Sequence, residues 1–200
     1  MEFTKTLLID AKSNNIKITS FYRFIYNFLF NPIWKFFVYL RISEYLNKKK
    51  KNSSLISYKF FFNISKYVLR RYSIRLGFSI PINTLMPGVY IPHYGSLVIN
   101  SNSKIGYNTC LHNNVVIGAN NGSLLAPQIG NNVFIGPGVK IFGNITIADG
   151  CYIGANCVVN KSIIEPNSVV VGIPQKTIRS EAIHWWQKNN WDLKIERNFN

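Results

Sequence analysis

The sequence predicts a mainly β fold in which six-residue repeats wind a coil of short strands, with a helical region before the coil and a short helix after it. Three observations support this. An aliphatic residue recurs at a spacing of six residues from Ile99 to Val159. Basic and aromatic residues are concentrated in residues 1–76. In residues 180–200, acidic and basic side chains are balanced at three each.

Residues 1–76 are predicted to form a basic, aromatic-rich helical region. They hold 15 of the 23 Lys and Arg residues and 18 of the 29 aromatic residues, but only three acidic residues. Helices are expected over 18–48 and 54–76, and KKKKN at 48–52 is expected to be a hinge or a surface patch. This mixture suits aromatic packing on the coil or on a sister subunit, and it also suits association with an anionic membrane surface. No nucleic-acid-binding motif accompanies the charge, so no nucleic-acid partner is expected.

We expect neither a signal peptide nor a membrane-spanning helix. The first residues lack a continuous apolar segment followed by a small-residue cleavage site. A spanning helix needs roughly 18 uninterrupted apolar residues. The most apolar run, FIYNFLFNPIWKFFVYL, is interrupted by Asn27, Asn31, Pro32 and Lys35. A cytoplasmic location is therefore expected, with the inner face of the membrane as a peripheral site.

The six-residue repeat defines the central region, residues 77–179. The aliphatic column consists of Ile99, Ile105, Leu111, Ile117, Ile129, Ile135, Ile141, Ile147, Ile153 and Val159. Ser123 interrupts it, inside a segment, 119–128, that is expected to be a loop. A period of six fits one short strand and one corner per repeat, with the aliphatic residue inside. A glycine often follows the aliphatic residue, which fits a corner with little steric room. An ordinary antiparallel sheet rich in Val and Ile is the alternative.

Two further features complete the organisation of the chain. Residues 180–200 are expected to form a short helix that caps the last coil, and His184 is expected to be structural or exposed there. The cysteines form an odd set without metal-ligand spacing, which favours reduced thiols and no metal site: Cys110, Cys151 and Cys157.

The repeats IGYNTC, IGNNVF, IGPGVK and IGANCV resemble those of the hexapeptide-repeat acyltransferases. The segment GFSIPINTLMPGVYIPHYGSLVIN is similar to the serine O-acetyltransferase branch, especially its relatives that acetylate polysaccharides and capsules. SVVVGIPQKTIRS is similar to the segment that closes the coil in members that use acetyl-CoA. The resemblance implies a left-handed parallel β-helix over 77–179, acetyl-CoA as co-substrate and a homotrimer.

His93 and His112 are the candidate catalytic residues. Acetyl transfer to a hydroxyl needs a base, and the pKa of a free imidazole, about 6.5, suits that task. His93 matches the general base of the serine acetyltransferases. His112 follows 19 residues later, about one coil on, so the two imidazoles are expected to share one cleft. A hydrogen-bonded structural histidine is the alternative for His93.

The chain departs from the serine acetyltransferase pattern around His93. Ser79 stands where the family has the aspartate that orients the histidine. Pro92 replaces an acidic residue, and Ala126 replaces a second histidine. These changes favour an acceptor other than free serine. They also predict that a backbone carbonyl or a hydroxyl, and not an aspartate, orients the His93 ring. The candidate acceptor-binding residues are Ser79, Tyr94, Asn113 and Asn114.

The residues that bind acetyl-CoA are predicted from the small residues at the corners of the coil and from the segment that closes it, residues 172–179. Small residues would let the pantetheine arm approach the backbone, and Lys176 and Arg179 would meet phosphates or, alternatively, form a solvated basic end. The candidates are Gly136, Gly154, Ala155, Gly172, Pro174, Lys176 and Arg179.

The function that the sequence favours is an acetyl-CoA-dependent O-acetyltransferase that modifies a sugar hydroxyl of a surface polysaccharide or its precursor. Direct attack in a ternary complex is expected, since no cysteine has an activating setting. Two alternatives remain open: a serine O-acetyltransferase of cysteine biosynthesis, and a non-catalytic β-helix scaffold.

Overall fold

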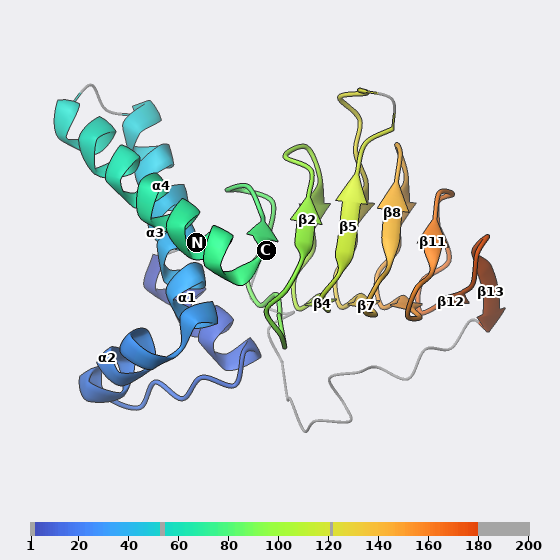
Figure 1. The fold of residues 1–200 in the computed structure, drawn as a ribbon, viewed down its shortest axis with the longest axis horizontal. Helices are drawn as coiled ribbons and strands as arrows, with labels where there is room; N and C mark the ends of the chain where they lie inside the picture. The colour runs from blue at the N-terminus through green and yellow to red at the C-terminus, as the bar shows by residue number, and fades with distance from the viewer. Residues whose placement is uncertain (1–2, 53–54, 121, 180–200) are drawn as a thin grey trace.

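The computed structural model of the chain describes residues 3–52, 55–120 and 122–179. Helices make up its N-terminal part and a stack of short parallel strands makes up the rest (Figure 1). The predicted short helix over 180–200, with His184, lies outside the described residues. The division into domains at residues 76 and 179 stays a prediction.

The helical region differs from the prediction in two ways. The helices are α1 (Phe3–Ser13), α2 (Phe21–Phe30), α3 (Pro32–Asn52) and α4 (Ile56–Leu76). Helix α1 was not predicted, and the helix expected over 18–48 is two helices. The KKKKN segment forms the last turns of α3 and is mostly exposed, so of its two predicted roles it fits a surface patch and not a hinge. Lysines in that position stabilise the negative end of the helix dipole.

The break between α2 and α3 has a local cause at Asn31 and Pro32. A residue before proline is disfavoured in the helical conformation, and Asn31 is extended, with φ −105° and ψ 105°. Its side-chain oxygen accepts a hydrogen bond from the Trp34 N–H at 3.0 Å. Proline is well suited to the first helical position that follows such a cap. Asn31 and Pro32 already interrupt the apolar run in the sequence, and the prediction of a single helix over 18–48 gave them too little weight.

The strands of residues 78–179 stack into three sheets in the described part of the chain. One contains, in order, β1 (Phe78–Ser79), β2 (Leu97–Ile99), β5 (Val115–Gly118), β8 (Lys140–Phe142) and β11 (Val158–Val159). Another contains β13 (Lys176–Arg179), β12 (Val169–Val171), β10 (Tyr152–Ile153), β7 (Phe134–Ile135) and β4 (Cys110–Leu111). The third contains β3 (Lys104–Ile105), β6 (Gln128–Ile129) and β9 (Thr146–Ile147). All pairings are parallel except β12 with β13, so the chain is a parallel β-helix and the antiparallel-sheet alternative is wrong.

The predicted aliphatic column forms the interior of this β-helix. All ten of its members are buried, and the residues two positions earlier, such as Val115 and Val139, are buried with them. The glycine that follows the inward residue lies at a corner with little steric room, as predicted. A Cβ on Gly136 would lie 2.9 Å from the backbone nitrogen of Ala155 in the next coil. The loop expected over 119–128 ends one residue early: 119–127 contains no strand among its described residues, and Gln128 begins β6.

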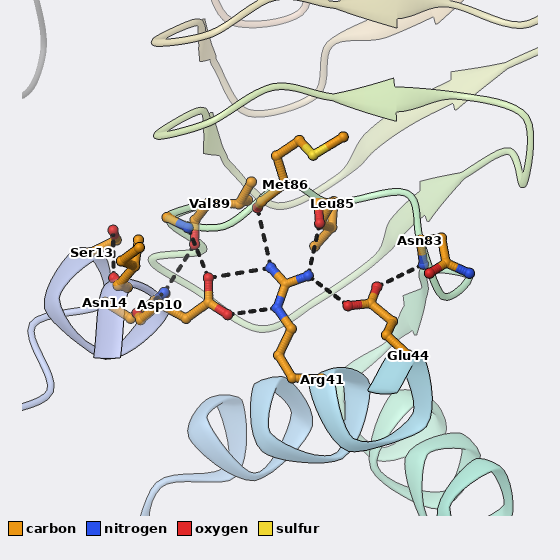
Figure 2. A network of polar contacts seen from close by, with 11 residues as sticks. Asp10, Ser13, Asn14, Arg41, Glu44, Asn83, Leu85, Met86 and Val89 are labelled. Atoms are coloured by element: carbon orange, nitrogen blue, oxygen red, sulfur yellow. Dashed lines mark hydrogen bonds and ion pairs between the residues drawn. The ribbon is translucent and has the colours of Figure 1, made fainter. Parts of the chain in front are cut away.

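A buried ion network fastens the helices to the first coil (Figure 2). Arg41 of α3 donates from Nε to the carboxylate of Asp10 of α1 at 2.7 Å, and from Nη1 to Glu44 at 2.8 Å. The carboxylate of Asp10 also accepts the Gly88 N–H at 2.8 Å. The guanidinium reaches the coil through two carbonyl groups, those of Leu85 and Met86. The helices and the coil therefore share one polar anchor and one continuous hydrophobic core.

Candidate active site

His93 lies on the outside of the β-helix, at the corner between the strand position of Tyr90 and β2. Its neighbours in the inward direction are Ile91 and Leu97, which are 2% and 0% exposed, whereas His93 is exposed. Gly95, two residues later, has φ 134°, in the region that favours glycine, and its N–H donates to the Leu76 carbonyl at 2.8 Å. If the six-residue register continued back from Ile99, His93 would fall in the inward column; its exposure shows that the register breaks here and that the imidazole lies outside the coil.

Helix α1 supports the segment that leads to His93. The side-chain amide of Asn14, at the end of α1, donates to the Val89 carbonyl at 2.9 Å. Its oxygen accepts the Ile91 N–H at 3.1 Å. One side chain thus satisfies two backbone groups just before His93, and the helix that was not predicted becomes part of the framework of the site.

His112 occupies the equivalent corner one coil later, directly after β4. The two imidazole rings are 6.1 Å apart between centroids. The two rings are therefore neighbours, as their spacing predicted, and a shared cleft stays a prediction. Burial lowers the pKa of His112, and the neighbouring His93 lowers it further. The His112 ring is therefore neutral at pH 7, able to accept or donate a hydrogen bond.

An aromatic ladder extends from His112 along the coils, and sequence reasoning missed it. The His112 ring lies 5.1 Å from the ring of Phe134. Phe134 stacks on Tyr152 at 4.2 Å with an interplanar angle of 4°. Both occupy the position before an inward isoleucine and are 18 residues apart, and this spacing could have revealed them. The ladder provides a flat apolar strip that begins at the histidines.

The asparagines after His112 form its corner. Asn113 lies beside Gly95, where an added Cβ would be 3.4 Å from the Asn113 Cβ. Asn114 adopts the left-handed conformation, with φ 59°, and its backbone and side-chain oxygens accept from the ammonium group of Lys140. Asn113 therefore lies against the segment that carries His93, two residues after the imidazole, whereas Asn114 is engaged with Lys140, which sequence reasoning did not select.

Ser79 and Ala126 replace residues of the serine acetyltransferase pattern, and the structure places them on different elements. Ser79 is exposed on β1 and pairs with Val98 of β2. Among the described residues, no hydrogen bond joins Ser79 to His93, and Tyr94 is 70% exposed. Ala126 is buried, with 2% exposure, at the end of the loop before β6. Among the residues that the structure describes, Ser79 stands in the place of the family aspartate and no carboxylate replaces it.

The predicted coenzyme-binding residues lie toward the other end of the β-helix. Gly136 follows β7 and Gly154 follows β10. A Cβ at either position would lie 2.9 Å from an atom of the next coil, so the stacking of the coils already explains both glycines. Ala155, Gly172 and Pro174 are exposed. Lys176 and Arg179 are the first and last residues of β13, and all four residues of that strand are exposed. From β4 to β12 the sheet takes three strand steps, about 14 Å.

The cysteines do not take part in this surface. Cys110, Cys151 and Cys157 are buried free thiols. Burial raises the pKa of each, which suppresses the thiolate that a nucleophile would need. In the described ranges, no group of three or more His, Cys, Asp or Glu residues could hold a metal ion.

Comparison with known proteins gives a consistent result. Residues 126–161 match the bacterial transferase hexapeptide family, six repeats. A serine acetyltransferase of Staphylococcus aureus is 32% identical over 139 residues, which cover 66% of this chain and 64% of that protein. A serine acetyltransferase of Mycobacterium tuberculosis is 36% identical over 92 residues, covering 45% of this chain and 40% of that protein. The chain thus spans about two fifths to two thirds of the length of these relatives.

The structure is also similar to solved serine acetyltransferases. One from Brucella abortus, crystallised in complex with coenzyme A, superimposes with a TM-score of 0.68 at 23% identity, covering 90% of this chain and 69% of that one. At this identity the likeness shows the fold. Residues 126–161 are therefore a hexapeptide segment of the bacterial transferase type, within a chain that has the fold of the serine acetyltransferases.

Proposed function

We propose that this chain is an acetyl-CoA-dependent O-acetyltransferase. One observation carries the proposal: two imidazoles, His93 and His112, lie 6.1 Å apart at equivalent corners of successive coils, at the start of an aromatic ladder. An exposed histidine held by a supported backbone is suited to proton transfer, and a neutral one beside it is suited to hydrogen bonding. The non-catalytic scaffold alternative gives no reason for this pairing.

The reaction is direct transfer. The imidazole of His93 accepts the proton of the acceptor hydroxyl while the oxygen attacks the thioester carbonyl carbon. The tetrahedral oxyanion collapses, the C–S bond breaks, and the CoA thiolate receives the proton from the imidazolium of His93. His112 and Asn113 are the candidate hydrogen-bond donors that hold the acceptor or the thioester oxygen. No cysteine carries the acetyl group.

L-Serine is the first acceptor to test. The relatives matched by sequence are serine acetyltransferases, so they favour the serine alternative over the polysaccharide acceptor, which no comparison supports. Coenzyme A in the Brucella abortus structure supports acetyl-CoA as the donor. The same proposal includes a left-handed sense for the β-helix and a cytoplasmic location. It also includes a homotrimer in which CoA lies in a groove between subunits that ends near Lys176 and Arg179.

A neutral hydroxyl, such as that of a sugar, is the second candidate acceptor, and one observation favours it. The ammonium group of free serine needs an acidic partner, yet residues 77–179 contain only Asp149 and Glu165 as acids. Asp149 is engaged with the backbone and side chain of Asn131, at 2.7 and 3.1 Å. Ser79 and Pro92 stand where the family resemblance led us to expect acids.

The test is release of CoA from acetyl-CoA, followed with a thiol reagent, with L-serine and with a panel of monosaccharides and nucleotide sugars. His93→Ala should abolish release with whichever acceptor is used, whereas His184→Ala, the matched histidine outside the repeat, should not. Full activity in a folded His93→Ala protein would overturn the catalytic assignment. Rapid turnover of serine would exclude the sugar acceptor as the main substrate.

A further inference from the structure

Helix α2 presents a continuous apolar stripe on its outer side. Six large side chains, at positions i, i+1, i+4, i+5, i+8 and i+9 of the helix, are between 37% and 81% exposed, and α2 has no buried residue. This spacing places them on one side of a helix. The stripe consists of Phe21, Tyr22, Ile25, Tyr26, Leu29 and Phe30.

The opposite side of α2 attaches the helix to the rest of the protein. The ring of Phe24 meets Trp34 edge-on at 6.1 Å, and the ring of Phe28 lies 5.9 Å from Tyr39. Both partners belong to α3. Because these contacts hold one side of α2, the exposed stripe faces away from α3. Helix α2 itself lies at the end of the molecule remote from the β-helix (Figure 1).

The charge around the stripe is positive. In residues 3–52 and 55–76 the acidic side chains are Asp10 and Glu44, and both are paired with Arg41. No carboxylate of the described helices is therefore left to neutralise the basic side chains near α2. Lys17 and Arg23 lie before and within α2 in the sequence, and the ammonium group of Lys35 lies 5.9 Å from the Phe28 ring of α2. The end of α4 adds Arg70, Arg71 and Arg75.

Packed rings bring the basic end of α4 close to α2. Tyr39 contacts Phe28 of α2 and stacks on Tyr72 of α4 at 5.7 Å. The ammonium group of Lys35 lies 5.9 Å from the Phe28 ring and 5.7 Å from the Tyr72 ring. Lys35 of α3 therefore borders α2 directly, and the basic end of α4, where Arg71 precedes Tyr72, adjoins α2 through the Tyr39 ring.

From this combination we propose that α2 docks on the surface of an anionic lipid bilayer. Its aromatic and aliphatic side chains enter the interface while the surrounding Lys and Arg residues meet the headgroups. No helix in the described part of the chain is long and apolar enough to span a membrane, so the helix lies in the plane of the interface. A second copy is the less suitable occupant, since pairing two such faces would bring like charges together. The inference does not depend on the acetyl acceptor.

The test is co-sedimentation of the full chain with vesicles of phosphatidylcholine, alone or mixed with phosphatidylglycerol. We expect binding to the mixed vesicles that weakens as salt rises. In the variant Ile25→Glu with Leu29→Glu, binding should fall by about tenfold or more, because two apolar contacts are lost and two repelled charges are added. The matched control is Leu124→Glu with Ile164→Glu, two exposed sites on the β-helix, which should bind like the unmodified protein.

Circular dichroism of each variant shows whether it is folded, and light scattering measures the assembly. The absence of binding to the mixed vesicles, or an equal loss of binding in the control variant, would overturn the proposal. The same is true if the α2 variant changes only the size of the assembly, which would identify a second copy as the occupant of the stripe. Since acetyl transfer to a water-soluble acceptor is measured without vesicles, failure of this proposal leaves the proposed function unaffected.

Discussion

Replacing Asp10 with asparagine tests whether the buried ion network holds the helices to the first coil. The carboxylate is fully buried and accepts three hydrogen bonds, from Arg41 Nε at 2.7 Å, Arg41 Nη2 at 3.3 Å and the Gly88 N–H at 2.8 Å. Asparagine keeps the shape of the side chain but removes its charge. The guanidinium of Arg41, itself 4% exposed, then loses its fully buried counter-ion.

The size of the effect follows from what remains around Arg41. Breaking a buried ion pair by removing one partner costs about 3–5 kcal/mol. Glu44 still lies 2.8 Å from Nη1, and two backbone carbonyls still accept hydrogen bonds, so the lower end of that range applies. We expect a decrease of about 3 kcal/mol in the free energy of unfolding, which for 200 residues corresponds to a Tm lower by roughly 6–12 °C.

The assay is urea-induced unfolding at pH 7, with a thermal melt as a second measurement. Asp149→Asn is the matched control, because that carboxylate accepts hydrogen bonds on the surface and its loss should cost less than about 1 kcal/mol. Arg41→Met should be more damaging than Asp10→Asn, since it removes two of the three donors to the buried Asp10 carboxylate together with the guanidinium that serves two backbone carbonyls. If Asp10→Asn were no more damaging than Asp149→Asn, the ion network would not anchor the helices.

Two further predictions concern the site. The pKa of His112 is lowered in the folded protein, so the stability that its neutral ring contributes is complete above a pH of about 6.5 and is lost as the pH falls. The free energy of unfolding should therefore decrease less between pH 8 and pH 5 in His112→Gln than in the unmodified chain. Equal decreases in the two proteins would contradict this. Asn14→Ala removes the hydrogen bonds to the Val89 carbonyl and the Ile91 N–H, so kcat should fall by about tenfold or more with a smaller change in KM. The control, Asn63→Ala on the exposed side of α4, should leave kcat and KM unchanged. An unchanged kcat in a folded Asn14→Ala protein would show that α1 does not position His93.

The repeat could be recognised in the sequence because each inward residue has the same environment as the inward residue six positions earlier. The inward position of Ile135, for example, follows from the same spacing as that of Ile153, and both are fully buried. The pairing of His93 with His112 was predictable for the same reason, since their separation is close to one coil. The helices had no such periodic constraint, so α1 and the break at Asn31 were missed.

The sequence alone therefore determined the coil, its aliphatic interior and the corner that carries both histidines, because these depend on contacts between neighbours at a fixed interval. Only the tertiary structure decided how that corner is supported. Asn14, Arg41 and Lys140 act on backbone groups between 26 and 77 residues away in the chain. No local pattern encodes such pairings, since a buried polar side chain is stable only where distant groups satisfy it.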